Sequence, residues 1–143
     1  MTQEEKELLI KDLCSRLPYN CMVSIAEGGI DGIKWADLTL NAYLFYQIME
    51  EDAWEYVKPY LRPISDMTTE ECERLFEILH IDENRGDWLK INDIGIIRLM
   101  TENGKDFYEI AQALYYLNSI HVDYNELIDK GLAKRASEGM YNN

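Results

Sequence analysis

The chain is short of basic residues. It has 14 lysines and arginines against 27 aspartates and glutamates, which gives a formal net charge of −13. Affinity for nucleic acid comes largely from basic side chains that displace counterions from phosphates, so direct binding to DNA or RNA is disfavoured. The acidity is typical of a solvated surface, and an acidic protein that imitates DNA is the alternative.

Residues for catalysis and metal binding are also scarce. The two histidines, His80 and His121, do not have the spacing of a metal-binding motif, and no two of Cys14, Cys21 and Cys72 have the CxxC spacing. The chain has neither a GxSxG elbow nor a phosphate-binding glycine loop. We therefore predict no catalytic residue, no metal and no cofactor, and interpret the cysteines as reduced, half-buried thiols.

Long apolar segments are missing as well. No eighteen apolar residues follow one another, and the first residues lack the apolar region of an export signal. We expect no contact with a membrane and a cytoplasmic location. A length of 143 residues with 47% hydrophobic residues predicts a single domain over residues 1–143, with a polar tail at about 133–143.

Capping boxes mark the starts of predicted helices. Thr2 with Glu5, and Thr68 with Glu71, have the spacing at which a side-chain oxygen and a carboxylate satisfy backbone amides at a helix start. The apolar stripes that follow predict helices up to Pro18 and up to about residue 80. Two further helices are predicted to begin near residues 106 and 123. The expected buried face of the first of these comprises Phe107, Ile110, Ala111, Leu114 and Leu117.

Strands are predicted between these helices. Alternating residues predict a strand over 21–25, followed by a glycine-rich turn at 28–32. Further strands are expected at 33–35, 43–48 and 94–100, although residues 36–56 fit one long helix equally well. Helices and strands that do not alternate regularly indicate an α+β fold, with a small antiparallel or mixed sheet packed against several short helices.

Three segments resemble a known group of proteins. TQEEKELLIKDLCSRLPY, VKPYLRPISDMTTEE and HVDYNELIDKGLA resemble segments of small uncharacterised proteins of Bacteroides and related gut bacteria, often encoded in prophages or other mobile elements. The resemblance implies a bacterial or phage cytoplasm and favours a strand at residues 43–48. It implies no activity, cofactor or catalytic residue.

The segment at residues 82–93 partly fits a calcium-binding loop. Asp82, Asn84 and Asp93 have the spacing of oxygen ligands, but Asp87 stands where the loop needs glycine, and Gly86 supplies no side-chain oxygen. A polar surface loop is therefore our prediction. His80, which precedes the loop, fits a helix C-cap better than a metal ligand.

The best candidate for partner binding is the segment at residues 54–62. Trp54, Tyr56, Tyr60 and Arg62 are of the types enriched at binding hot spots, and packing of these aromatics onto the sheet is the alternative. We expect a non-enzymatic, phage-associated or mobile-element accessory protein that binds another protein. The alternatives are a DNA-mimic inhibitor and a small enzyme whose histidines and carboxylates meet only in space. A homodimer formed through an edge strand is a further prediction.

Overall fold

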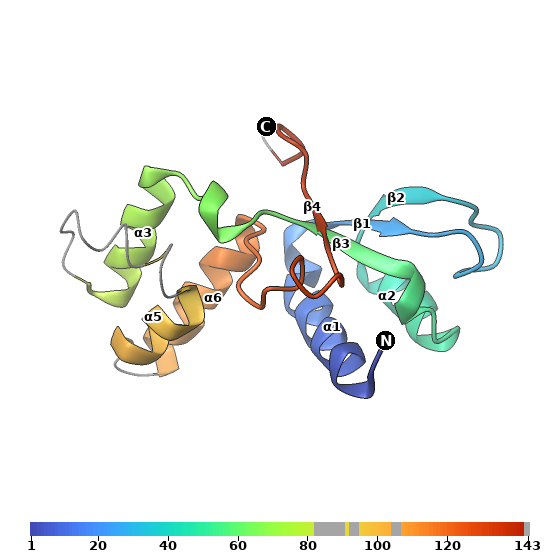
Figure 1. The fold of residues 1–143 in the computed structure, drawn as a ribbon, viewed down its shortest axis with the longest axis horizontal. Coiled ribbons are helices and arrows are strands. Elements are labelled where there is room, and N and C mark those ends of the chain that lie inside the picture. The colour runs from blue at the N-terminus through green and yellow to red at the C-terminus, as the bar shows by residue number, and fades with distance from the viewer. Residues whose placement is uncertain (82–90, 92–94, 104–106, 142–143) are drawn as a thin grey trace. The chain divides into compact units, whose positions relative to one another are not determined.

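The chain forms two compact units. The computed structural model describes residues 1–81, 91, 95–103 and 107–141. Unit 1 comprises residues 1–61 and 127–143, and unit 2 comprises residues 62–126 (Figure 1). Each unit has its own cluster of buried apolar side chains. The single domain stays a prediction, because two cores can still unfold as one cooperative unit.

All four strands belong to unit 1. This unit contains α1 (Gln3–Arg16), η1 (Leu17–Tyr19), β1 (Met22–Ile25), β2 (Ala36–Thr39), α2 (Ala42–Glu50), η2 (Trp54–Tyr56), β3 (Val57–Leu61) and β4 (Lys134–Arg135). Unit 2 contains η3 (Ile64–Asp66), α3 (Thr69–Leu79), α5 (Ile96–Asn103) and α6 (Phe107–Ser119). The strand order is β2-β1-β3-β4, with β4 parallel to β3 and the other pairs antiparallel. This mixed sheet with short helices confirms the predicted α+β fold.

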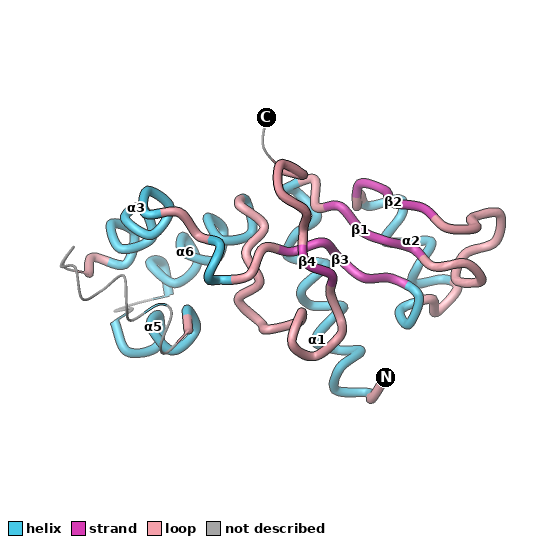
Figure 2. Tube along the Cα trace, turned by 45° about the horizontal axis from the view of Figure 1, so that its top comes forward, coloured by secondary structure: helices cyan, strands magenta, loops and turns pink. Residues whose placement is uncertain are grey.

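Helices α1 and α2 cover one face of the sheet (Figure 2). Val23 and Ile25 of β1 are buried in the same cluster as Leu9 and Leu13 of α1 and Ile48 of α2. Strand β3 alternates between buried and half-buried residues, so its polar residues lie on the opposite face, called here the outer face.

The strand pairing explains how β3 tolerates a proline. The Ala26 amide donates to the Tyr56 carbonyl at 2.8 Å, so these two residues form a hydrogen-bonded pair. In an antiparallel ladder such pairs alternate with pairs that make no hydrogen bond to each other. Val23 lies opposite Pro59, at a pair that makes no such bond. Proline therefore costs the ladder no donor at this position.

Helix α1 confirms the first predicted capping box. The Thr2 hydroxyl accepts from the Glu5 amide at 3.1 Å, and the Glu5 carboxylate accepts from the Thr2 amide at 3.2 Å. The hydrogen bond from the Thr2 backbone is the main reason why the pKa of Glu5 lies below its ordinary value. The interpretation of half-buried thiols is wrong, because Cys14 is exposed while Cys21 and Cys72 are buried.

The segment at residues 43–48 is helical, and the predicted strand there is wrong. The Asn41 side chain caps α2 by accepting from the Leu44 amide at 2.8 Å. Leu44 and Ile48 are buried one turn apart. The Phe45 ring packs edge-on against the Trp54 ring, with 5.4 Å between the two ring centres. Burial every fourth residue, together with the cap, selects the helix. The strand predicted at 33–35 is wrong, because a bend occupies this segment and β2 begins only at Ala36.

In unit 2, α3 confirms the second capping box, whereas the predicted strand at 94–100 is wrong. Thr68 and Glu71 make both reciprocal hydrogen bonds of the box. Residues 96–100 lie in α5 instead. Ile96, Leu99 and Met100 are buried with helical spacing, and this pattern outweighs the strand preference of the isoleucines.

Helix α6 is confirmed, but part of its predicted buried face is not. Phe107 is 92% exposed, whereas Leu117 is buried. The helix predicted from residue 123 is absent, because residues 121–131 form turns and irregular structure, with an isolated bridge at Val122. Glu126 has a φ of 57°, which interrupts a right-handed helix.

The predicted polar tail is described by the structure up to Tyr141. Leu132 and Ala133 are buried in unit 1, and β4 pairs with β3 directly after them. The Tyr141 hydroxyl donates to the Tyr60 carbonyl at 2.6 Å. Backbone pairing and the Tyr141 hydroxyl therefore contribute to holding a segment that has few apolar residues.

Candidate functional site

The four predicted partner-binding residues differ in burial and belong to both units. Trp54 is 3% exposed and belongs to the core of unit 1, whereas Tyr56 is exposed. Tyr60 lies on the outer face, where its hydroxyl donates to Asp37 at 2.9 Å. Arg62 belongs to unit 2. A joint role of these residues in partner binding stays a prediction, and Trp54, Tyr60 and Arg62 each have structural contacts of their own.

Arg62 ties together three parts of unit 2. Its guanidinium donates to both carboxylate oxygens of Glu71, at 2.8 and 2.7 Å. It also donates to the Ile120 and Asp66 carbonyls, each at 3.0 Å. Burial would raise the pKa of Glu71, but hydrogen bonds from Arg62 and Thr68 outweigh burial and hold that pKa below its ordinary value.

The outer face of the sheet carries a connected polar cluster. The Lys134 ammonium donates to the Ser24 hydroxyl at 3.2 Å and lies 4.3 Å from the centre of the Trp35 ring. It is also 5.9 Å from the Tyr60 ring. Burial is the main cause that raises the pKa of Tyr60, and its hydrogen bond to Asp37 adds to the shift. The cluster links residues of all four strands and their flanks.

Tyr141 takes the place of a hydrogen bond between two strands. Hydrogen-bonded pairs alternate with non-bonded pairs between β1 and β3, and Val23 and Pro59 form a non-bonded pair. Met22 and Tyr60, the adjacent pair, should therefore be hydrogen-bonded to each other. Instead, the Met22 amide donates to the Tyr141 hydroxyl at 2.9 Å, and this hydroxyl donates to the Tyr60 carbonyl. The hydroxyl lies 3.8 Å from Cys21 Sγ, and burial raises the pKa of Tyr141.

The buried Cys21 thiol should make stability depend on alkaline pH. Burial raises its pKa from 9.0 to about 11. Below pH 9 the Cys21 thiol keeps its proton in both the folded and the unfolded state. Between pH 9 and about 11 the thiol loses this proton in the unfolded state but keeps it in the folded state, so the free energy of unfolding falls. Two pKa units correspond to about 3 kcal/mol. Urea unfolding at several pH values should show a shallower fall in the Cys21→Ala variant than in the wild type.

The exposed Cys14 provides the control for this prediction. The Cys14→Ala variant removes the same side chain from a position where burial does not act on it. Equal pH dependence of the Cys14→Ala and Cys21→Ala variants between pH 9 and 11 would contradict the prediction.

Helix α2 exposes an aromatic face on the side away from the core. Tyr43, Tyr46 and Met49 are 72%, 54% and 50% exposed, and their spacing of three residues places them along one side of the helix. We call them the α2 face. The predictions from sequence missed it because they treated this segment as a strand, although the Asn41 cap was a usable signal.

Acidic side chains follow the α2 face at the C-terminal end of the helix. Glu50 and Glu51 are exposed, and no basic residue occurs in α2. Carboxylates are unfavourable near the negative end of a helix dipole, by about 0.3 to 1 kcal/mol each. Asp52 forms an ion pair with Lys6 at 2.7 Å. The α2 face therefore ends in negative charge that does not stabilise its own helix.

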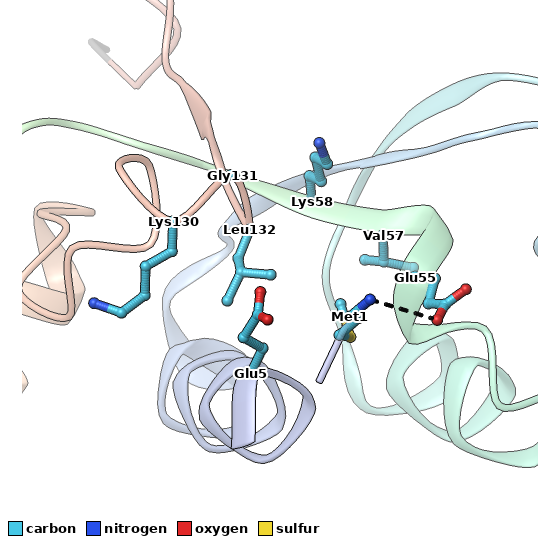
Figure 3. A pocket seen from close by; sticks show the side chains of 8 residues that line it. All are labelled: Met1, Glu5, Glu55, Val57, Lys58, Lys130, Gly131 and Leu132. Atoms are coloured by element: carbon cyan, nitrogen blue, oxygen red, sulfur yellow. Dashed lines mark ion pairs between the residues drawn. The ribbon is translucent and has the colours of Figure 1, made fainter. Parts of the chain in front are cut away.

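Unit 1 also has a shallow cavity of about 280 Å³ (Figure 3). Its lining comprises the acidic Glu5 and Glu55, the apolar Leu132, and Lys58 and Lys130, whose ammonium groups point away from the other lining side chains (Figure 3). The Met1 amine lies 4.0 Å from Glu55. Because charges of both signs are present and the carboxylate of Glu5 already caps α1, the cavity does not select one class of ligand.

The histidines lie apart from any metal-binding group in the described part of the chain. His80 is the C-cap of α3 with a φ of 54°, as predicted, and its Nε2 lies 3.6 Å from Glu109. His121 is buried in unit 2. Over residues 1–81, 91, 95–103 and 107–141, no three histidine, cysteine or acidic side chains are grouped closely enough to hold a metal. Of the segment at residues 82–93, predicted to be a polar surface loop, only Ile91 lies within the described residues.

No helix in the described ranges combines the length and the apolar character needed to cross a membrane. The resemblance to proteins of Bacteroides stays a prediction. Comparison of the chain with protein families, with curated proteins and with solved structures finds no match.

Proposed function

We propose that this protein acts by binding another protein through the α2 face, without catalysis of its own. The observation that supports the proposal most is the exposure of Tyr43, Tyr46 and Met49 along one side of a helix whose other side is anchored in the core. Tyrosines of this kind are enriched at binding hot spots because they bury a large area at a small entropic cost.

The charge around the α2 face indicates the chemistry of the partner. Glu50 and Glu51 extend the face with negative charge, and the whole chain carries a net charge of −13. A complementary partner presents an apolar groove bordered by lysine or arginine side chains. We place this interaction in a reducing compartment such as the bacterial or phage-infected cytoplasm, in keeping with the three unpaired cysteines.

A capture experiment with matched variants tests the proposal. The immobilised Tyr43→Ala/Tyr46→Ala variant should lose a host protein that the wild type retains, with an affinity lower by about 100-fold, because hot-spot residues contribute at least about 1 to 2 kcal/mol each. Both side chains are exposed, so we expect each substitution to change the free energy of unfolding by less than about 0.5 kcal/mol. Mass spectrometry identifies the retained protein, and titration of the purified protein measures the affinity.

The control replaces two exposed tyrosines elsewhere. The Tyr108→Ala/Tyr115→Ala variant makes the same chemical change on α6 and should retain the partner. Equal loss in both variants would contradict the proposal. Capture that disappears in 0.5 M salt but is unaffected by either pair of substitutions would support an acidic DNA mimic instead.

A further inference from the structure

The segment after the buried Ala133 lies across the outer face and along one edge of the sheet. We call residues 134–141 the C-terminal strap. Its β4 pairs with β3, and the Ala136 amide donates to the Leu61 carbonyl at 2.8 Å. Lys134 and Tyr141 attach it further through their side chains, to Ser24 and to the backbone of β1 and β3.

Lys134 occupies a cation site built by other parts of the sheet. The Trp35 ring lies 4.3 Å from its ammonium, the Ser24 hydroxyl accepts from it, and Tyr60 forms a second aromatic wall at 5.9 Å. An aromatic ring and a hydroxyl around an ammonium are the features that recognise a lysine side chain. The site therefore suits a lysine ammonium, and in this structure the ammonium is that of Lys134 from the same chain.

Most of the strap is accessible to solvent. Its residues 134–141, all described by the structure, are exposed or half-buried, whereas Leu132 and Ala133 just before them are buried. Strand β4 has only two residues. Departure of the strap would expose the half-buried Tyr141 but no fully buried side chain, and the chain would remain anchored at Ala133.

The sheet can satisfy its own backbone when Tyr141 leaves. The Met22 amide and the Tyr60 carbonyl, which the Tyr141 hydroxyl now bridges, stand at the next hydrogen-bonded position of the β1–β3 ladder. Closure of this pair replaces the bridge with a direct bond. Two alternative arrangements thus use the same donor and the same acceptor.

We propose that the strap is a displaceable occupant of a docking site for an extended, lysine-bearing segment of another protein. This segment replaces β4 beside β3, adds a parallel strand there, and places its lysine between Trp35 and Tyr60. The acidic chain favours such a basic segment. The inference does not rest on the α2 face, and its test uses different residues.

A peptide with the sequence of residues 133–143 serves as the probe, labelled with fluorescein at its N-terminus. Fluorescence anisotropy should show binding to the full chain carrying Lys134→Ala/Tyr141→Phe, which weakens the strap and leaves the docking site intact. Binding to the wild type should be at least about 10-fold weaker, because its own strap competes at a high effective concentration. A peptide carrying Lys134→Ala should bind the double variant about 10-fold more weakly than the unaltered peptide does.

Several results would overturn the proposal. These are equal binding of the two peptides, or no peptide binding to a double variant that circular dichroism shows to be folded. The Lys130→Ala variant, which changes an exposed lysine outside the strap, should bind the probe as weakly as the wild type does.

Hydrogen exchange of the wild type provides a second test that needs no variant. The Ala136 amide, which donates to the Leu61 carbonyl, should exchange through a local opening, at least about 100-fold faster than the amides of the buried residues of α1. Exchange of Ala136 only through global unfolding would show that the strap is a fixed part of unit 1.

Discussion

Replacing Asp12 by alanine is expected to lower the free energy of unfolding by about 3 to 5 kcal/mol. Asp12 and Arg16 lie one turn apart in α1, and both side chains are 0% exposed. Arg16 Nε and Nη2 donate to the two carboxylate oxygens at 2.7 and 3.1 Å. In the Asp12→Ala variant the guanidinium of Arg16 stays buried but loses this carboxylate. The carboxylate offsets the cost of removing the guanidinium from water, so its loss has a large effect.

Urea unfolding of a small set of variants measures this effect. The Glu7→Ala variant removes an exposed carboxylate from the same helix and should change stability by less than about 0.5 kcal/mol. The Asp12→Ala/Arg16→Met variant should be more stable than Asp12→Ala alone, because it removes the buried charge as well. A loss below about 1 kcal/mol for Asp12→Ala would contradict the prediction.

Replacing Arg62 by alanine is expected to destabilise unit 2 by about 2 to 4 kcal/mol, because hydrogen bonds to charged groups contribute about 1.5 to 3 kcal/mol each and are not additive. The substitution removes the paired bonds to Glu71 and those to the carbonyls of Ile120 and Asp66. These contacts join Arg62, which directly follows β3, to η3, to the first turn of α3 and to the residue that follows α6. The side chains of Arg62 and Glu71 are only 20% and 17% exposed, so water replaces the bonds poorly.

The Arg62→Lys variant is the matched control. Lysine keeps the charge but cannot reproduce the paired geometry, so it should recover about half of the loss. Hydrogen exchange of the α3 and α6 amides reports the stability of unit 2 directly. Full stability in the Arg62→Ala variant would show that the apolar cluster holds these elements without the guanidinium.

The two substitutions together also test the number of domains. Asp12 belongs to unit 1 and Arg62 to unit 2. If residues 1–143 form one cooperative domain, each substitution lowers the protection of the slowest amides in both units by the same free energy. If the units unfold separately, each substitution affects its own unit.

Several contacts that matter most for stability and for the proposals have no local signal in the sequence. Asp12 and Arg16 have the spacing of an ordinary surface ion pair, and only the packing of α1 shows that both are buried. Lys134 and Ser24 are 110 positions apart in the chain, and Tyr141 and Met22 are 119 apart. Contacts of this kind follow from strand order, which residue patterns do not specify.

By itself the sequence determined the features that a few neighbouring residues can set. The capping boxes at Thr2 and Thr68, the strand around Val23 and the cap at His80 all depend on hydrogen bonds or alternation within about four residues. Tertiary structure decided that residues 42–50 and 96–103 are helices, although Asn41 marked where the first of them could begin, because short apolar segments fit either period until a core selects which side chains are buried. It also decided where the C-terminal strap lies, since β3 offers the pairing edge that those few polar residues cannot form among themselves.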